Sequence, residues 1–297
     1  MTGCLENRSA LITGASRGLG RAIAEAYMKE GADLLLCARK KDRLDATAAE
    51  LRSLTGAKRR IETFAADLGQ AEDVDRLADY AFRCFPSLDI LVSNAGIYGP
   101  KGPLESVDWN DFVKTLTVNV LGSARLYRAV LPAFKSRGSG KIIQLSGGGA
   151  TNPLPFLSAY ALSKAAIVRL VETVAEETRG SGIDVNAIAP GALNTGMLEE
   201  ILAAGPDAVG EAFYQRALRQ KQEGGTPLSR GADLAVYLAS AASNGLTGKL
   251  ISAVWDPWEQ FDRHRQDLDQ TDLLTLRRIV PSDRGWNWDR TDARGVS

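Results

Sequence analysis

Seven short apolar runs recur along the chain, and longer stretches with helical periodicity separate them. Strands that are buried on both faces read as continuous apolar runs, whereas half-exposed strands alternate apolar and polar residues. We therefore predict an α/β fold in which helices cover both faces of a doubly wound, parallel, seven-stranded sheet. The predicted strands are Ser9–Thr13, Leu34–Cys37, Ile61–Ala65, Ile90–Ser93, Ile142–Leu145, Val185–Ala189 and Leu250–Val254.

One insertion and one tail depart from this alternation. Residues 196–227 contain two helix-like stretches, 197–204 and 208–221, which predict a helical substrate lid. We predict a single domain over residues 1–255 and an extension over 256–297 that packs on the domain or on a neighbouring subunit. A role of the tail in shaping a pocket for a polar or anionic substrate is the alternative. The tail region carries four tryptophans, Trp255, Trp258, Trp286 and Trp288, and an apolar set at helical spacing, Leu273, Leu276 and Val280.

Composition narrows the chemistry. The 297 residues include 36 basic and 36 acidic side chains without a block of one sign, so we expect no nucleic-acid and no membrane partner. His264 is the only histidine and the three cysteines are scattered, which argues against a His-based triad or a metal site. No apolar run approaches the ~18 residues of a membrane-spanning helix. We expect a soluble, cytoplasmic protein that acts on a small molecule.

A glycine-rich turn follows the first predicted strand and leads into a helix. Glycines allow close approach of the backbone to a ligand, and a helix N-terminus attracts anions, so a dinucleotide pyrophosphate fits here. The spacing G-x-x-x-G-x-G is not a generic phosphate-loop motif, and a purely structural turn is the alternative. The expected cofactor-binding residues of this turn are Gly14, Ser16, Arg17, Gly18, Leu19 and Gly20.

The end of the second strand indicates which dinucleotide binds. An acid there selects a cofactor without a 2′-phosphate, but this chain has Ala38 followed by Arg39. With Arg17 as a second cation, NADP is the expected cofactor, and NAD is possible. Two solvated arginines without such a role are the alternative. Asp67, after the third strand, accepts a hydrogen bond from adenine or caps the next helix, and both readings stay open.

Tyr160 and Lys164 lie four residues apart on a predicted helix and therefore share one face. An ammonium beside a phenol favours the phenolate and lowers the phenol pKa, which makes tyrosine usable as a general acid or base. On spacing alone, a tyrosine and a lysine four residues apart are usually a pair on the exposed face of a helix without a catalytic role. The neighbouring motifs are therefore decisive.

Further motifs follow later strands: Ser93-Asn94-Ala95-Gly96 after the fourth, Leu145-Ser146-Gly147 after the fifth and Pro190-Gly191-Ala192-Leu193-Asn194-Thr195 after the sixth. Together with Asn119, Tyr160 and Lys164, this ordered set resembles the short-chain dehydrogenase/reductase family of non-extended, Rossmann type. The resemblance covers about residues 5–255. It extends to 3-oxoacyl-carrier-protein reductase-like enzymes and related NADP-dependent carbonyl reductases.

The resemblance implies residue roles. Tyr160 would exchange a proton with the substrate oxygen, and Lys164 would lower the Tyr160 pKa and bind the nicotinamide ribose. Asn119 would interrupt its helix and hold a water that links Lys164 to solvent. The family implies cofactor contacts from Asn94, Ala95, Gly96, Pro190, Gly191 and Thr195. It also implies a homodimer or homotetramer that pairs through the helices at 111–134 and 158–179.

One position departs from the family pattern. The serine that binds the reacting oxygen usually precedes the tyrosine by thirteen residues, and Gly147 stands there. Either one extra residue in the following loop brings Ser146 into place, which we favour, or the serine is lost and Thr151 or Ser158 substitutes. The expected function is hydride transfer between NADP(H) and a carbonyl or secondary alcohol. A catalytically impaired sensor or scaffold that binds the dinucleotide is the alternative.

Overall fold

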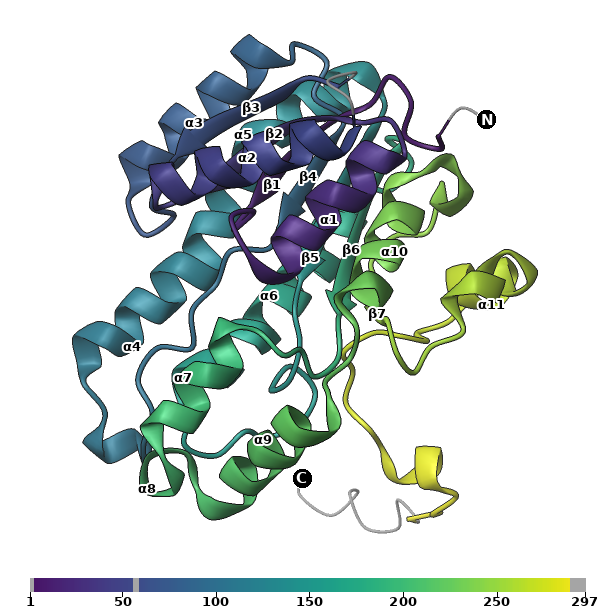
Figure 1. The fold of residues 1–297 in the computed structure, drawn as a ribbon. Coiled ribbons are helices and arrows are strands. Elements are labelled where there is room, and N and C mark those ends of the chain that lie inside the picture. The colour runs from purple at the N-terminus through teal and green to yellow at the C-terminus, as the bar shows by residue number, and fades with distance from the viewer. Residues whose placement is uncertain (1–2, 56–58, 289–297) are drawn as a thin grey trace.

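The computed structural model describes residues 3–55 and 59–288. Its centre is one parallel sheet with the strand order β3-β2-β1-β4-β5-β6-β7 (Figure 1). All seven predicted strands are present, which confirms the doubly wound fold; the edge strand β7 is shorter than predicted. The strands are β1 (Ser9–Thr13), β2 (Asp33–Ala38), β3 (Ile61–Ala65), β4 (Ile90–Ser93), β5 (Gly140–Leu145), β6 (Ile183–Ala189) and β7 (Leu250–Ser252).

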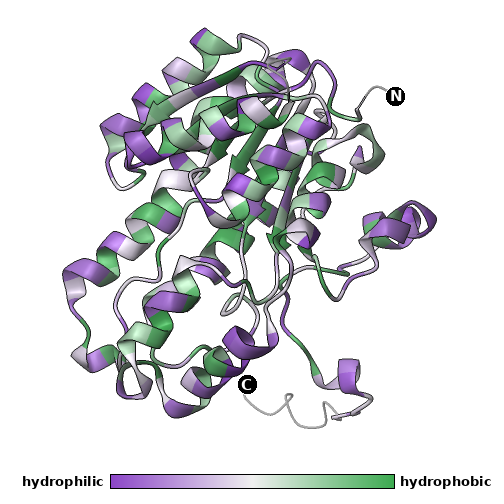
Figure 2. Ribbon diagram, in the orientation of Figure 1, coloured by the Kyte–Doolittle hydropathy of each residue, from purple (hydrophilic) through white to green (hydrophobic). Residues whose placement is uncertain are grey.

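Alternate residues of each strand serve different faces of the sheet. In β1, Ala10 and Ile12 join one apolar core and Leu11 joins the other. The first core is closed by α1 (Gly18–Lys29), α2 (Lys41–Thr55) and α10 (Leu228–Ala239). The second is closed by α3 (Ala71–Cys84), α5 (Gly122–Arg137) and α6 (Ser158–Glu177). Figure 2 accordingly shows hydrophobic strands between helices that carry hydrophilic positions on their outer sides.

The strand order reverses between β1 and β4. The register pairs Leu11 with Leu35 of β2 on one side and with Leu91 of β4 on the other, and each of these residues is fully buried. The chain after β1 therefore leads outward to β2 and β3, and later returns to β4. In open parallel sheets, ligands bind outside the carboxyl ends of the strands at such a reversal. The glycine turn and the segment after β4 both emerge there.

Two helical regions surround this edge. A continuous helix runs from α4 (Trp109–Leu116) through a π-helical turn, η2 (Thr117–Leu121), into α5. The predicted lid is formed by α7 (Gly196–Ala204), α8 (Pro206–Val209) and α9 (Glu211–Glu223), which lie together below the sheet in Figure 1. Short 3-10 turns complete the domain at η1 (Leu104–Ser106) and η3 (Ala241–Ser243).

The tail folds onto the domain beside β7. It contains η4 (Trp258–His264), α11 (Arg265–Gln270) and η5 (Pro281–Arg284), and it buries Trp258, Phe261 and Leu268 in the first core. The helical spacing of Leu273, Leu276 and Val280 is misleading, because this stretch forms turns and extended chain. The backbone of this stretch bonds to the sheet edge instead of forming a helix, since Leu250 N donates to Leu274 O at 2.8 Å.

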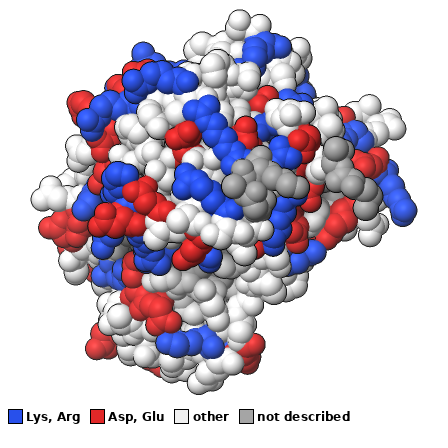
Figure 3. Space-filling model, turned by 45° about the horizontal axis from the view of Figure 1, so that its top comes forward, with Lys and Arg blue, Asp and Glu red and all other residues white. Residues whose placement is uncertain are grey.

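No helix among the described residues is long and apolar enough to cross a membrane. Basic and acidic side chains are interspersed over the face drawn in Figure 3.

Candidate active site

The glycine turn is built around the end of β1. Gly14 has a φ of +66°, and a Cβ placed on it would lie 2.7 Å from Asn94 Nδ2. A Cβ on Gly20 would lie 2.4 Å from Gly14 O, so the turn packs tightly against the start of α1. Arg17, the N-cap of α1, makes no side-chain cap. The uncapped N–H groups of α1 and the close backbone fit a pyrophosphate.

Thr13, which is not among the predicted site residues, ties this turn to the segment after β4. Its Oγ1 accepts hydrogen bonds from Asn94 N at 2.9 Å and Ala95 N at 3.1 Å. Asn94 Nδ2 returns a bond to Thr13 O at 2.9 Å. The Asn94 side chain therefore holds the two loops together. Ala95 and Gly96 leave the floor of the crevice without bulky side chains. A hydroxyl residue at a strand end, before a glycine turn, is the only sequence signal for Thr13.

The two arginines are not brought together. Both are exposed, and neither side chain makes a hydrogen bond or ion pair within residues 3–55 and 59–288. Arg39 follows β2 directly, whereas the Arg17 guanidinium reaches toward the lid, 2.8 Å from a Cβ placed on Gly196. Asp67 Oδ1 accepts from Gly69 N at 2.9 Å, and the N-cap of α3 is Gln70. Asp67 thus shapes the turn before α3 instead of capping that helix.

Tyr160 and Lys164 lie on the buried face of α6, with 9% and 6% of their surface exposed. Lys164 Nζ lies 5.4 Å from the centre of the Tyr160 ring and donates to Leu145 O at 3.0 Å. Burial lowers the pKa of Lys164 to about 8. Burial, and secondarily Tyr98, raises the pKa of Tyr160 above its ordinary value. The expected lowering of the Tyr160 pKa by Lys164 is therefore absent here, and desolvation sets the direction of the shift.

Asn119 lies inside the π-helical turn, so the expected interruption of its helix is confirmed. π-Helical turns often occur at functional sites. The Asn119 side chain holds Ile97 in both directions: Ile97 N donates to Oδ1 and Nδ2 donates to Ile97 O, each at 2.9 Å. Nδ2 also donates to Ser163 Oγ at 2.9 Å. Asn119 and Lys164 meet at Gly96, where a Cβ would lie 3.3 Å from Asn119 Oδ1 and 3.9 Å from Lys164 Nζ.

Ser146 and Gly147 differ in what they face. Ser146 is buried, and its hydroxyl donates to Lys164 O on α6 at 3.3 Å. Gly147 has a φ of +147°, and a Cβ placed on it would have Tyr160 Oη, 3.9 Å away, as its nearest neighbour. The position beside the Tyr160 hydroxyl therefore carries no side chain.

The segment after β6 connects the crevice to the lid. Gly191 has a φ of +88°, and a Cβ there would lie 2.6 Å from Thr226 Oγ1 at the far end of the lid. Thr195 is the N-cap of α7 and accepts from Met197 N at 3.3 Å. Its Cγ2 would lie 3.4 Å from a Cβ on Gly18, so this segment faces the glycine turn. Pro190 is buried between β6 and Gly191.

The lid presents an apolar surface to Tyr160. Tyr160 belongs to a cluster with the buried Leu157 and four buried lid residues. Tyr98, after β4, packs against the same cluster, and its ring centre lies 4.6 Å from that of Tyr160. Sequence reasoning misses Tyr98, although its position two residues after Asn94-Ala95-Gly96 is a usable signal. The lid members of the cluster are Leu198, Ile201, Val209 and Ala217.

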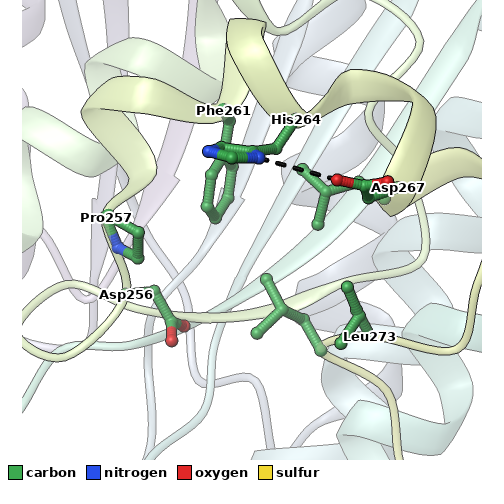
Figure 4. A pocket seen from close by; sticks show the side chains of 8 residues that line it. Asp256, Pro257, Phe261, His264, Asp267 and Leu273 are labelled. Atoms are coloured by element: carbon green, nitrogen blue, oxygen red, sulfur yellow. Dashed lines mark ion pairs between the residues drawn. The ribbon is translucent and has the colours of Figure 1, made fainter.

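A separate cavity of about 260 Å³ lies in the tail (Figure 4). Phe261, Leu268 and Leu273 contribute to its mainly apolar lining. His264 points along its rim toward Asp267, with 3.6 Å between Nδ1 and Oδ2. None of the predicted site residues lines this cavity.

A doubly wound sheet with a glycine turn, a buried Tyr-Lys pair and a helical lid defines a dinucleotide-dependent oxidoreductase. The family profile of the short chain dehydrogenases matches residues 8–205. Dehydrogenase/reductase SDR family member 4 of Sus scrofa is 30% identical over 247 residues, which are 83% of this chain and 86% of that protein. The chain therefore belongs to the short-chain dehydrogenase family, and it is an enzyme of the dehydrogenase/reductase class.

Two solved structures resemble it closely. A putative NAD(P)-dependent gluconate 5-dehydrogenase from Beutenbergia cavernae, with bound NADP, has a TM-score of 0.73 and 31% identity, and the match covers 84% of this chain and 96% of that one. A 7α-hydroxysteroid dehydrogenase complexed with NADH and 7-oxo glycochenodeoxycholic acid has a TM-score of 0.74 and 28% identity, covering 84% and 93%.

Proposed function

We propose that the protein is an NADP(H)-dependent reductase of an apolar ketone, with Tyr160 as the group that protonates the new alkoxide. The observation that carries this proposal is the burial of Tyr160 beside Lys164 at the ligand edge of the sheet, beneath an apolar lid. When bound, the nicotinamide supplies hydride to the carbonyl carbon. The residues of this chain supply the proton, the orientation and the exclusion of water.

The Tyr160 phenol holds a proton at neutral pH, and ketone reduction consumes that proton. Its raised pKa makes it a weaker acid, so this protonation state by itself does not select the direction of the reaction. Lys164, with its pKa near 8, is largely charged at neutral pH and lies beside Gly96, where a ribose hydroxyl fits. Asn119 supports this arrangement through Ile97 and Ser163. Ser146 positions the α6 backbone at Lys164 through its hydroxyl.

The choice of NADP(H) rests on charge. The related structures bind NADP in one case and NADH in another, so family membership leaves the choice open. In this chain Arg39 and Lys40 follow β2 without an acid. The Arg17 guanidinium lies beside Gly196 of the lid, so Arg39 is the cation on which the assignment depends. An arginine at this strand end accommodates the 2′-phosphate. Ala95, Gly96, Gly191 and Thr195 line the rest of the proposed cofactor crevice, and Asp67 has its Oδ2 available for the adenine.

The substrate class follows from the lid. The residues that it buries against Tyr160 are apolar, whereas its ion pair between Lys221 and Glu199, 3.0 Å apart, joins two exposed side chains. An apolar wall binds an alicyclic or aromatic ketone better than a sugar, because sugar hydroxyls would lose hydrogen bonds there. The described tail makes no hydrogen bond or ion pair to the lid, so it gives no support to a polar pocket.

Assembly is part of the proposal. The α4 to α6 side of the molecule exposes large apolar side chains, which monomers rarely gather on one side. They are Trp109, Val113, Leu121 and Leu162. We infer a homo-oligomer that pairs through this surface.

A cofactor and substrate screen tests the function. NADPH and NADH oxidation are measured with an alicyclic ketone, an aromatic ketone, a quinone and a ketose. We expect NADPH turnover with the apolar carbonyls and little with the ketose. Arg39→Ala should raise the KM for NADPH by tenfold or more and leave the KM for NADH unchanged, since only NADPH carries the 2′-phosphate. Equal use of NADH by the wild type would contradict the cofactor assignment.

Gly147 is the observation that favours the second candidate, a dinucleotide-binding sensor with little turnover. Binding of NADPH without oxidation of it by any of these carbonyls would support that candidate.

A further inference from the structure

We propose that Tyr98 is a further catalytic residue, whose phenol hydroxyl donates a hydrogen bond to the same substrate oxygen that Tyr160 protonates. The proposal rests on the proposed ketone reduction. It follows from the missing side chain at Gly147 and from the placement of Tyr98 against Tyr160.

The reacting oxygen needs a second donor that the loop after β5 does not provide. A developing alkoxide is stabilised by donors fixed before the reaction, and each is worth a large factor in rate. Gly147 faces the Tyr160 hydroxyl but has no side chain. The Ser146 hydroxyl is directed to Lys164 O.

The other hydroxyls of this region are poorly placed. Ser158 precedes Tyr160 by two residues on α6, and residues two apart do not share a helix face. Thr151 is exposed, and its Oγ1 accepts from Asn152 Nδ2 at 3.3 Å.

Tyr98 is held in position from both sides. Its predecessor Ile97 is bonded twice to Asn119. Its successor Gly99 has a φ of +73°, and a Cβ there would lie 1.8 Å from Thr115 Oγ1. The backbone therefore fits tightly against the helix of Asn119, and it directs the Tyr98 ring onto the ring of Tyr160, with centres 4.6 Å apart. Such anchoring is what a preorganised donor requires.

The Tyr98 hydroxyl is available as a donor. Within the described parts of the chain it makes no hydrogen bond, although the residue is half-buried. Burial, together with the nearby Glu200, raises the pKa of Tyr98 to about 12, so the phenol stays neutral and keeps its proton. Lys101 Nζ lies 5.8 Å from the ring centre and 3.9 Å from Glu200 of α7. Lys101 thereby connects Tyr98 to α7 of the lid.

Tyr98→Phe tests the proposal, because it removes the hydroxyl and keeps the ring contact. Reduction of cyclohexanone and of acetophenone by NADPH is measured over pH 6 to 10, with the dissociation constant for NADPH and the melting temperature. We expect kcat/KM to fall on the order of 100-fold. Affinity for NADPH and melting temperature should stay unchanged, and the loss in kcat/KM should persist across the whole pH range, because a missing donor is missing at every pH. Tyr80→Phe is the matched control, since Tyr80 is also a half-buried tyrosine against an aromatic ring, that of Phe64.

The outcomes separate this proposal from the proposed function. If Tyr160→Phe abolishes turnover while Tyr98→Phe keeps the wild-type kcat/KM, the Tyr98 assignment is wrong and the proposed function stands. A Tyr98→Phe effect that appears only as a shifted pH dependence would also overturn it, because the hydroxyl would then act by tuning Tyr160. If the wild type reduces neither ketone, both proposals fail.

Discussion

Lys164 shows how catalysis and stability oppose each other at a single residue. It is almost fully buried, and no carboxylate pairs with it in the described structure. Its Nζ donates to one backbone acceptor, Leu145 O. It also lies at the edge of the cofactor crevice, beside Gly96. Desolvation of a charged group costs stability unless a partner compensates. The lowered pKa of Lys164 is the measure of that cost.

Replacement of Lys164 by methionine should therefore stabilise the protein in the absence of cofactor. The folded pKa is about 8 and the unfolded value is 10.5, so below pH 8 both states are protonated and the full cost is present. The cost disappears as the pH rises from 8 to 10.5. We expect Lys164→Met to raise the free energy of unfolding by on the order of 3 kcal/mol at pH 7, and by little near pH 10.5. Denaturant unfolding at both pH values measures this difference.

Lys141→Met is the matched control for that prediction. Lys141 is also mostly buried, but its Nζ lies 2.6 Å from Asp184 Oδ2. Removal of this lysine leaves a carboxylate without its partner, so the variant should be less stable than the wild type. A Lys164→Met variant that loses stability in the same way would contradict the cost assigned to Lys164.

At the residue scale, sequence reasoning finds what local spacing determines. Tyr160 and Lys164 are four residues apart on one helix, and Gly14 and Gly20 follow a strand, so their neighbourhoods follow from chain order. Two other outcomes depend on tertiary packing. Desolvation decides that the Tyr160 pKa rises, and the anchoring of Ile97 to Asn119, 22 positions away, decides where Tyr98 lies.

At the scale of elements, the tail is attached to the domain through both side chains and backbone. Lys249 Nζ donates to Thr271 O and Leu273 O, and Leu276 N donates to Glu172 Oε1. These bonds hold the tail beside β7 and α6, and the bond from Leu250 N to Leu274 O occupies the free edge of β7 itself. An edge strand left open is a template for pairing with another chain, and the tail covers this one.

One tryptophan of the tail region is packed into the core and another is exposed, so the two test whether the tail stabilises the domain. Trp258 is 7% exposed and packs against Tyr237, whereas Trp255 is 84% exposed. Trp258→Ala should lower the free energy of unfolding by about 3 to 5 kcal/mol, because it opens a cavity in the first core. Trp255→Ala should change it by less than about 0.5 kcal/mol. Equal effects in denaturant unfolding would contradict the packing of the tail on the domain.

The elements themselves were predictable where one physical cause dominates. Strands buried on both faces give unbroken apolar runs, and each of the seven lies where such a run occurs. The segment at 271–280 was not predictable from its spacing, because an apolar residue every three or four positions also fits an extended chain that crosses β7 and α6.

At the scale of the whole molecule, the exposed apolar side chains on α4, η2 and α6 bear on assembly. Leu121 and Leu162 are 60% and 48% exposed on the side that carries Trp109 and Val113. The double variant Leu121→Glu, Leu162→Glu should dissociate the proposed oligomer, since charges would be buried in its interface. Size-exclusion chromatography with light scattering gives the mass. Leu54→Glu, at a residue 60% exposed on α2, should leave the mass unchanged.

The central claim is that Tyr160 protonates the substrate while the remainder of the site binds NADPH. Its most direct test is single-turnover oxidation of NADPH with cyclohexanone by the wild type and by Tyr160→Phe, each saturated with cofactor. The account predicts a loss of at least 1,000-fold in the rate, on the order of what general acid catalysis contributes, at an unchanged dissociation constant for NADPH. A Tyr160→Phe variant that oxidises NADPH at the wild-type rate would contradict it.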